Sequence, residues 1–434
     1  MLDAHRSSIL HLLGDPTSIP EDEAYQYYED GLLVINEGRV VEVGSADRLL
    51  LSLPKDTNVI NHSNTLLLPG FIDTHIHFPQ SEIIAAHGKQ LMDWLNELVF
   101  PAESKYGNKD YAELMADMFI NQLLRNGTTT ASVFCSVHPE SVDALFEKCH
   151  EKNLRMIAGK VMMDRNCPVN LRDSAETSYR ESKKLIERWH NRGRLRYAIT
   201  PRFAVTSSPA QLDQVRQLML EHPDAYLQTH LSENQDEISL VRKLFPEYKS
   251  YLDVYDQYGL LSQRSIFAHC LHLGIDEWHR LSETQSNIAF CPSSNLFLGS
   301  GLFPLEKAEE RTINVGIGSD IGGGNNFSIL QTLGDAYKVV QLRKEQMSPM
   351  KGIYLATLGG ARTLGLSDKI GNFLPGKEAD FVCLDKGATP LLKMRIEKCE
   401  DLWAEIFALS MLGDDRVVKQ TWIAGAKLHD RDVK

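Results

Sequence analysis

Short apolar runs recur along the middle of the chain, separated by longer segments with helical spacing. Between about residues 71 and 366 we count eight, which are FIDTHIH from 71, GTTTASVF from 127, LRMIAGKVMM from 154, LRYAITPR from 195, AYLQTHL from 225, SIFAHC from 265, NIAFCP from 287 and INVGIGSD from 313. Short apolar runs of this kind are typical of buried strands. Strands that alternate with helices predict a parallel sheet, and eight of them predict closure as a (β/α)8 TIM-type barrel.

The segment YAELMADMFINQLLRNG, from residue 111, illustrates the helical spacing between these runs. Residues three or four apart lie on one face of a helix. On this basis the sequence predicts a helix with an apolar stripe that contains Leu114, Met118, Gln122, Leu123 and Leu124. Glycine readily ends a helix, so Gly127 is the expected stop.

The two ends of the chain have strand patterns of a different kind. GLLVINEGRVVEVG at 31–44 predicts a hairpin, and GKEADFVCLD at 376–385 and VVKQTWIAGAKL at 417–428 return to strand character, with a turn near Gly425. Each piece alone is too short to cover its apolar face. We therefore expect residues 1–69 and 371–434 to form one small β-sandwich domain beside a barrel at 70–370.

Composition excludes several classes of partner. The 434 residues include 46 Lys and Arg against 58 Asp and Glu, a formal net charge of −12, which offers no basic surface for nucleic acid. No stretch approaches the roughly 18 apolar residues of a membrane span, and the first residues lack the apolar core of a secretory signal. Seven scattered cysteines form no CxxC pair, which argues against a disulfide framework. These features predict a cytoplasmic protein.

Polar residues end four of the predicted strands, where the working side chains of such a barrel project. The first run ends in HIH, and strand alternation places His75 and His77 on the same face. The other three runs contribute His230, His269 and Asp320. One HxH pair alone is a weak signal, but four strands that deliver such residues at one end predict a shared metal centre. Nitrogen and carboxylate ligands without thiolate fit Zn²⁺, with Fe²⁺ as the alternative.

Longer motifs add a family resemblance. PGFIDTHIH, QTHLSEN, FAHC, GIGSD and GNFLPGKEADFVCLD are similar to the amidohydrolase superfamily. Within it, HIHFPQSE, LNELVFPAE, NGTTTASVF, ITPRFAVTSS and CPSSNLFLGSGLF resemble the guanine deaminases over nearly the whole chain. The resemblance implies one zinc ion per chain, hydrolysis of guanine to xanthine and ammonia, and a homodimer.

The resemblance also implies roles for individual residues. The metal ligands are expected to be His75, His77, His230 and Asp320. It makes Glu233 the proton shuttle and His269 a partner of the water that the metal activates. Substrate binding is assigned to Gln80, Arg202 and Phe203, together with the ligands His230 and Asp320.

These residue types suit the reaction. A bound metal lowers the pKa of water from 15.7 to about 7, which supplies hydroxide for attack at C2 of guanine, and Asp320 can accept the proton. Glu233 can protonate the ring nitrogen and later help ammonia to leave. Arg202 only donates hydrogen bonds and suits the O6 acceptor of guanine, whereas Gln80 offers both a donor and an acceptor. Phe203 provides a ring surface for the base.

Several alternatives stay open from the sequence. The substrate could be another aminopurine, an oxidised guanine, a pterin or a chlorotriazine, and the fold could serve a non-catalytic scaffold. Lys160 raises the possibility of a carbamylated lysine that bridges two metals, although the fourth run ends in Arg202 and favours a single ion. The segment LMDWLNELVFP at 91–101 is either a lid over the substrate or a plain amphipathic helix.

Overall fold

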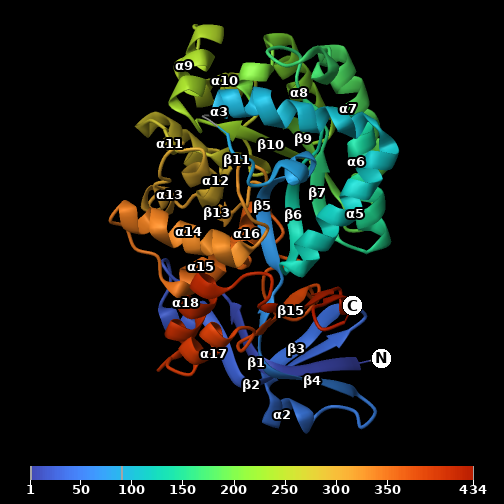
Figure 1. The fold of residues 1–434 in the computed structure, drawn as a ribbon, viewed down its shortest axis with the longest axis vertical. Coiled ribbons are helices and arrows are strands. Elements are labelled where there is room, and N and C mark those ends of the chain that lie inside the picture. The colour runs from blue at the N-terminus through green and yellow to red at the C-terminus, as the bar shows by residue number, and fades with distance from the viewer. Residues whose placement is uncertain (1, 89–90, 434) are drawn as a thin grey trace.

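A computed structural model describes residues 2–88 and 91–433. The chain forms a barrel of parallel strands surrounded by helices and, below it in Figure 1, a separate sheet built from both ends of the chain. Both parts of the predicted fold class are therefore confirmed. In the part of the chain that the structure describes, no helix has the length and apolar character needed to cross a membrane.

Eight parallel strands form the barrel, and each lies within one of the eight apolar runs. They are β5 (Phe71–His77), β6 (Thr128–Phe134), β7 (Arg155–Gly159), β9 (Arg196–Pro201), β10 (Tyr226–Leu231), β11 (Ser265–His269), β12 (Asn287–Phe290) and β13 (Val315–Ile317). The short β8 (Val161–Met162) pairs with β9. The Thr74 hydroxyl donates to the Ile317 carbonyl at 2.9 Å and so links the first strand to the last.

Helices connect the strands and cover the outside of the barrel (Figure 1). The longer ones are α5 (Lys109–Arg125), α6 (Pro139–Glu151), α7 (Ala175–Trp189), α8 (Pro209–Glu221), α9 (Gln235–Leu244), α11 (Ile275–Glu283) and α14 (Ile329–Leu342). Shorter ones are α10 (Tyr251–Gln257), α12 (Pro292–Phe297), α13 (Leu305–Glu309), α15 (Pro349–Ala356) and α16 (Leu358–Thr363).

Helix α5 shows where the apolar pattern was misread. The helix forms as predicted and is followed by Gly127 at φ +79°, but Leu114 is 68% exposed and Met118 38% exposed. The buried face instead contains Ala112, Met115, Ala116, Phe119, Ile120, Leu123 and Leu124. The prediction of a stripe through Leu114 and Met118 was therefore wrong. The face that turns inward carries the larger apolar set, to which Leu123 and Leu124 belong as predicted.

The second sheet has seven strands in the order β16-β15-β14-β4-β1-β2-β3. They are β1 (Leu2–Leu12), β2 (Tyr25–Asn36), β3 (Arg39–Ser45), β4 (Asn58–Pro69), β14 (Phe381–Asp385), β15 (Val418–Ile423) and β16 (Ala426–Asp430). The short α1 (Glu21–Ala24) and α2 (Ala46–Leu50) belong to the N-terminal part, and α17 (Pro390–Ile396) and α18 (Leu402–Leu412) to the C-terminal part. Antiparallel pairing of β14 with β4 joins the two ends of the chain, as expected.

A buried charge cluster connects this sheet to the barrel. Arg155 begins β7 and Arg194 precedes β9, and both guanidinium groups bind the Glu378 carboxylate, at 2.5 Å and 2.7 Å. Arg194 also pairs with Asp380. The cluster lies at the N-terminal ends of the barrel strands, opposite to the ends that carry the predicted site.

We expect Glu378→Gln to destabilise the fold by about 3 kcal/mol, because removal of one partner leaves buried charges without compensation. Chemical denaturation of the two proteins measures the difference in the free energy of unfolding. A loss below about 1 kcal/mol, typical of exposed ion pairs, would contradict a structural role for this carboxylate.

Candidate active site

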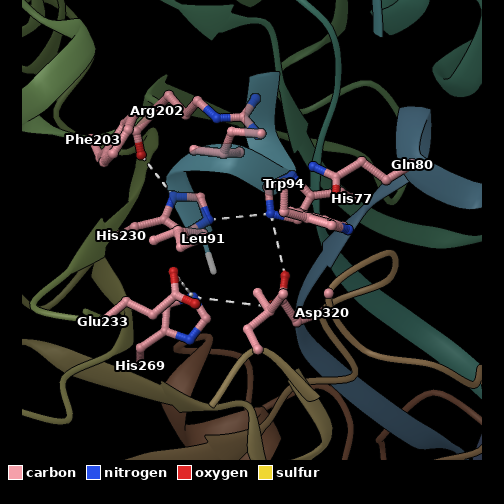
Figure 2. Close-up of a pocket in the computed structure, with 13 residues that line it drawn as sticks. His77, Gln80, Leu91, Trp94, Arg202, Phe203, His230, Glu233, His269 and Asp320 are labelled. Atoms are coloured by element: carbon pink, nitrogen blue, oxygen red, sulfur yellow. Dashed lines mark hydrogen bonds and ion pairs between the residues drawn. The ribbon is translucent and has the colours of Figure 1, made fainter. Parts of the chain in front are cut away.

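The C-terminal ends of five barrel strands deliver side chains to one cavity (Figure 2). His77 comes from β5, Arg202 follows β9, His230 lies in β10 and His269 ends β11. Asp320 follows β13. Residues up to 243 positions apart thus meet because parallel strands share one carboxyl edge.

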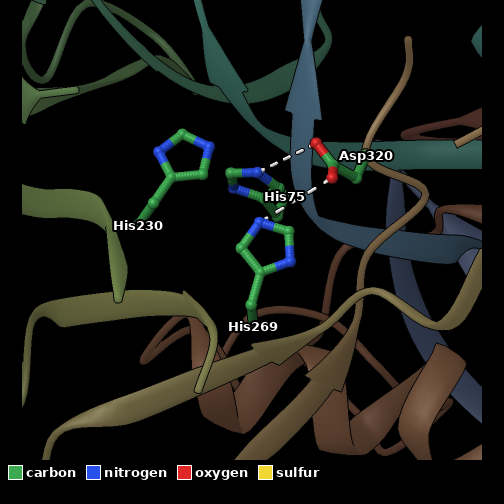
Figure 3. A group of neighbouring side chains, drawn as sticks. All are labelled: His75, His230, His269 and Asp320. Carbon is green, nitrogen blue, oxygen red and sulfur yellow. Dashed lines mark ion pairs between the residues drawn. The ribbon is translucent and has the colours of Figure 1, made fainter. Parts of the chain in front are cut away.

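Figure 3 shows a buried group that could hold a metal ion. One ligand-type atom from each of His75, His230, His269 and Asp320 lies within 4.8 Å of the others. His77 lies against the same group, with its Nε2 atom 3.2 Å from Nε2 of His230 and 3.3 Å from Oδ1 of Asp320. Nε2 of His75 is 3.1 Å from the same oxygen. All five metal-site residues considered from the sequence therefore come together.

The spacing of these atoms fits a cation. Ligands about 2.1 Å from a tetrahedral zinc ion stand about 3.4 Å apart, close to the separations among His75, His77, His230 and Asp320. The Nδ1 atom of His230 is 2.7 Å from the Arg202 carbonyl, so a proton on Nδ1 leaves Nε2 free to coordinate. Burial lowers the pKa of His77 to about 3 and that of His230 well below its usual value. Neutral imidazoles are the form that binds metal.

The local backbone places these groups with some strain. His269 and Asp320 have φ angles of +72° and +50°, where residues other than glycine are uncommon. Such conformations cost on the order of 1–3 kcal/mol each and concentrate at functional sites. Asp73 supports the arrangement, because its carboxylate accepts the backbone N–H groups of His75 and Ser319, at 3.2 and 3.0 Å.

Glu233 lies beside the side chains that could hold a metal ion, and its own side chain is buried. Burial raises its pKa to about 8, and the negative charge of Asp320 adds to the shift. The Ser300 hydroxyl donates to Oε1 at 3.1 Å, and Oε2 is 3.5 Å from Nε2 of His269. Burial also opposes ionisation of Asp320, but the nearby imidazoles of His75 and His77 outweigh it and hold the Asp320 pKa well below its usual value. The site therefore contains one carboxyl that retains its proton at neutral pH and one that does not.

The opposite side of the cavity carries the residues predicted to bind substrate. Gln80, Arg202 and Phe203 all line it, and Figure 2 shows Arg202 and Gln80 on the far side from Glu233 and His269. Leu91 and Trp94 of α3 (Leu91–Trp94) also face the cavity, as does Leu95. The segment at 91–101 therefore forms part of the cavity wall, as the lid interpretation requires.

The structure also shows the surroundings of Lys160 and Gly323. Lys160 is fully buried and pairs with Asp173 and Glu181, so its amine is held by two carboxylates. Gly323 lines the cavity, and a Cβ atom there would lie 2.5 Å from Oγ of Ser294. Close packing against Ser294 explains this glycine.

Sequence reasoning missed three supporting residues. Glu103 binds Gln80 and Arg202, Ser300 binds Glu233, and Asn295 is 2.9 Å from Nδ1 of His269. Glu103 lies in the motif LNELVFPAE and the other two lie in CPSSNLFLGSGLF. The motifs were therefore visible, but their contacts join residues distant in the sequence.

Comparison with known proteins places this geometry in a family context. The model for the Amidohydrolase family matches residues 66–428. Guanine deaminase from Escherichia coli strain K12 is 54% identical over 415 residues, which cover 95% of this chain and 94% of that protein. The solved structure of E. coli guanine deaminase superimposes with a TM-score of 0.96 at 52% identity, covering 99% of this chain and 100% of that one.

A second solved structure is that of guanine deaminase from C. acetobutylicum, with guanine bound in its active site. It is 28% identical and has a TM-score of 0.90, and the match covers 99% of this chain and 100% of that one.

Proposed function

The chain belongs to the amidohydrolase family, and on that premise we propose that it catalyses the hydrolytic deamination of guanine to xanthine and ammonia. The observation that carries the proposal is the 54% identity to E. coli guanine deaminase across almost the full length of both proteins. The cavity supports it, because acid–base groups line one side and hydrogen-bonding and aromatic groups line the other.

We propose that the metal is zinc, one ion per chain, held by His75, His77, His230 and Asp320. Three imidazoles and one carboxylate without thiolate favour Zn²⁺, and Fe²⁺ is the chemical alternative. When bound there, the ion would supply Lewis acidity that makes water a nucleophile at neutral pH. We place His269 outside the ligand set, as the partner of the attacking water; its Nε2 atom lies 3.8 Å from Oδ2 of Asp320.

We assign the proton transfers of the reaction to side chains of the protein. We assign to Glu233 the transfer of a proton to the ring nitrogen beside C2, since burial keeps this carboxyl protonated at neutral pH. Asp320 is ionised and can accept a proton from the attacking water. His269 faces both carboxylates and can orient that water, and Asn295 fixes the plane of its ring.

Recognition of the base is assigned to the opposite wall. Arg202 offers only donors and meets the O6 acceptor of guanine, whereas the 6-amino group of adenine would place a donor against a donor. The ring of Phe203 can pack against the purine. Gln80 lies beside Arg202 and extends the same polar wall.

The purified protein, loaded with zinc, should convert guanine to xanthine, with adenine at least about tenfold slower. Adenine has no amino group at C2, and its 6-amino group would meet the donors of Arg202, a mismatch that costs about 1–3 kcal/mol. Ammonia release and the ultraviolet change of the purine measure both rates, and metal content is determined on the same sample. A panel with other aminopurines, a pterin and a chlorotriazine separates the related substrates. No turnover of guanine by metal-loaded protein would refute the proposal, and absence of bound metal would favour a scaffold.

The same family membership leads us to propose a homodimer that works in the cytoplasm. We also propose that the small domain comprises residues 1–69 and 371–434 and the barrel domain residues 70–370. Sedimentation of the purified protein tests the dimer, and limited proteolysis tests the boundaries.

A further inference from the structure

Glu103 is a fully buried carboxylate behind the polar wall of the active site. It ends α4 (Phe100–Glu103), in the segment that follows the cavity-lining residues Leu91 and Trp94. Its side chain is not among those that line the cavity. The Ser136 hydroxyl donates to its backbone carbonyl at 2.9 Å and anchors this end of the helix.

Both hydrogen-bonding residues of the wall are attached to this one carboxylate. Nη1 of Arg202 donates to both oxygens of Glu103, at 2.8 Å each. Nε2 of Gln80 donates to Oε1 of Glu103 at 3.1 Å. A buried Arg–carboxylate pair contributes little net stability compared with apolar residues of the same size. Its presence beside the cavity therefore points to a role in recognition.

The carboxylate fixes which end of the Gln80 amide faces it. An ionised carboxylate only accepts hydrogen bonds, so it must meet the amide nitrogen and not the amide oxygen. The backbone N–H of Gly322 donates to Oε1 of Gln80 at 3.4 Å and selects the same orientation. The Gln80 carbonyl is thereby turned toward Gly322, with one lone pair engaged, and the second N–H of Nε2 is the donor left for a ligand. Gln80, which by residue type offers a donor and an acceptor, is oriented to present its donor.

From this arrangement we propose that Glu103 is a positioning residue that makes the wall formed by Gln80 and Arg202 a purely donating surface. The inference rests on the proposed function and deepens it. Guanine presents two adjacent acceptors, O6 and N7, on one edge, whereas a 6-amino purine presents a donor beside N7. A wall of donors selects the 6-oxo purine, and Glu103 sets that preference without touching the substrate.

The test compares guanine with 2,6-diaminopurine, which keeps the 2-amino leaving group but replaces O6 with an amino group. In Glu103→Gln the new amide can donate as well as accept, so only the long 3.4 Å bond from Gly322 still orients the Gln80 amide, and Gln80 can turn and offer its carbonyl to the 6-amino group. We expect the ratio of kcat/KM for guanine over kcat/KM for 2,6-diaminopurine to fall at least about tenfold, because one buried hydrogen bond to guanine is no longer matched. The change should arise mainly from a higher KM for guanine. Zinc content should not change.

Glu378→Gln is the matched control, because it also breaks a buried Glu–Arg contact but lies at the other end of the barrel. It should keep the wild-type preference at temperatures where it is folded. If Glu103→Gln is folded and active with an unchanged preference, the inference is wrong. If wild-type protein does not deaminate guanine, the proposed function fails first.

A second variant, Gln80→Met, tests the amide orientation even if Glu103→Gln does not fold. If Gln80 donates to the substrate, its loss should reduce kcat/KM for guanine more than for 2,6-diaminopurine. If the Gln80 carbonyl faces the substrate, the loss should be larger for 2,6-diaminopurine. That second result would overturn the inference, because Glu103 could not then be fixing the amide.

Discussion

Replacement of Glu233 by Gln should lower kcat by about 10²- to 10⁴-fold, the range typical for loss of a positioned acid–base group. The amide has the size of the protonated carboxyl and can still accept a hydrogen bond from the Ser300 hydroxyl, so the cavity should keep its shape. It cannot give up a proton and take it back within one turnover. The reaction should therefore stop at the protonation of the ring.

Single-turnover and steady-state rates of guanine loss measure this effect, and zinc analysis of the same sample shows that the metal site is intact. Glu283→Gln, an exposed carboxylate on α11, is the matched control and should retain the wild-type rate. A Glu233→Gln protein with a rate within about threefold of wild type, far from the loss of about 10²-fold or more expected for a positioned acid–base group, would remove Glu233 from the mechanism.

The second large effect distinguishes His77, a proposed metal ligand, from its neighbour His269. His77→Ala should weaken zinc binding by more than about 100-fold, because even loss of an outer partner of a ligand costs about 10- to 100-fold. His269→Asn should keep the zinc but slow turnover at least about tenfold. Competition with a fluorescent chelator measures affinity, and the deamination assay measures rate.

The two variants together decide the ligand set. The ligand-type atoms of His75, His230, His269 and Asp320 all lie within 4.8 Å of one another, although we propose His77 in place of His269. Loss of zinc in His269→Asn with normal zinc in His77→Ala would reverse that choice. Loss in both would indicate that all five groups share the ion.

Much of the architecture could be predicted because it depends on local patterns. Each barrel strand is a short apolar run, and parallel strands must present their carboxyl ends at one edge. The convergence of His75, His230 and Asp320 follows from that rule alone, whereas the roles of Gln80 and Phe203 came from family resemblance. Geometry added their position on one cavity wall.

The parts that could not be predicted depend on contacts across the fold. Glu103 is 99 positions from Arg202 and 23 from Gln80, and no periodicity links them. The buried face of α5 was misread because the stripe was drawn through Leu114 and Met118, whereas the larger apolar set that includes Met115, Phe119 and Ile120 faces the strands. Leu123 and Leu124 belong to both sets, so the choice between the two faces is not fixed by the local pattern.

The cluster of Arg155, Arg194, Glu378 and Asp380 ties the C-terminal segment to the floor of the barrel, whereas the proposed active site lies at its mouth. The stability of the fold and the selectivity for substrate therefore depend on opposite ends of the barrel. Substitutions at the floor can therefore change the stability of the fold, and substitutions at the mouth can change which base is accepted, each independently of the other. For an engineer, the floor is the place to begin when a longer-lived catalyst is wanted with its chemistry left alone.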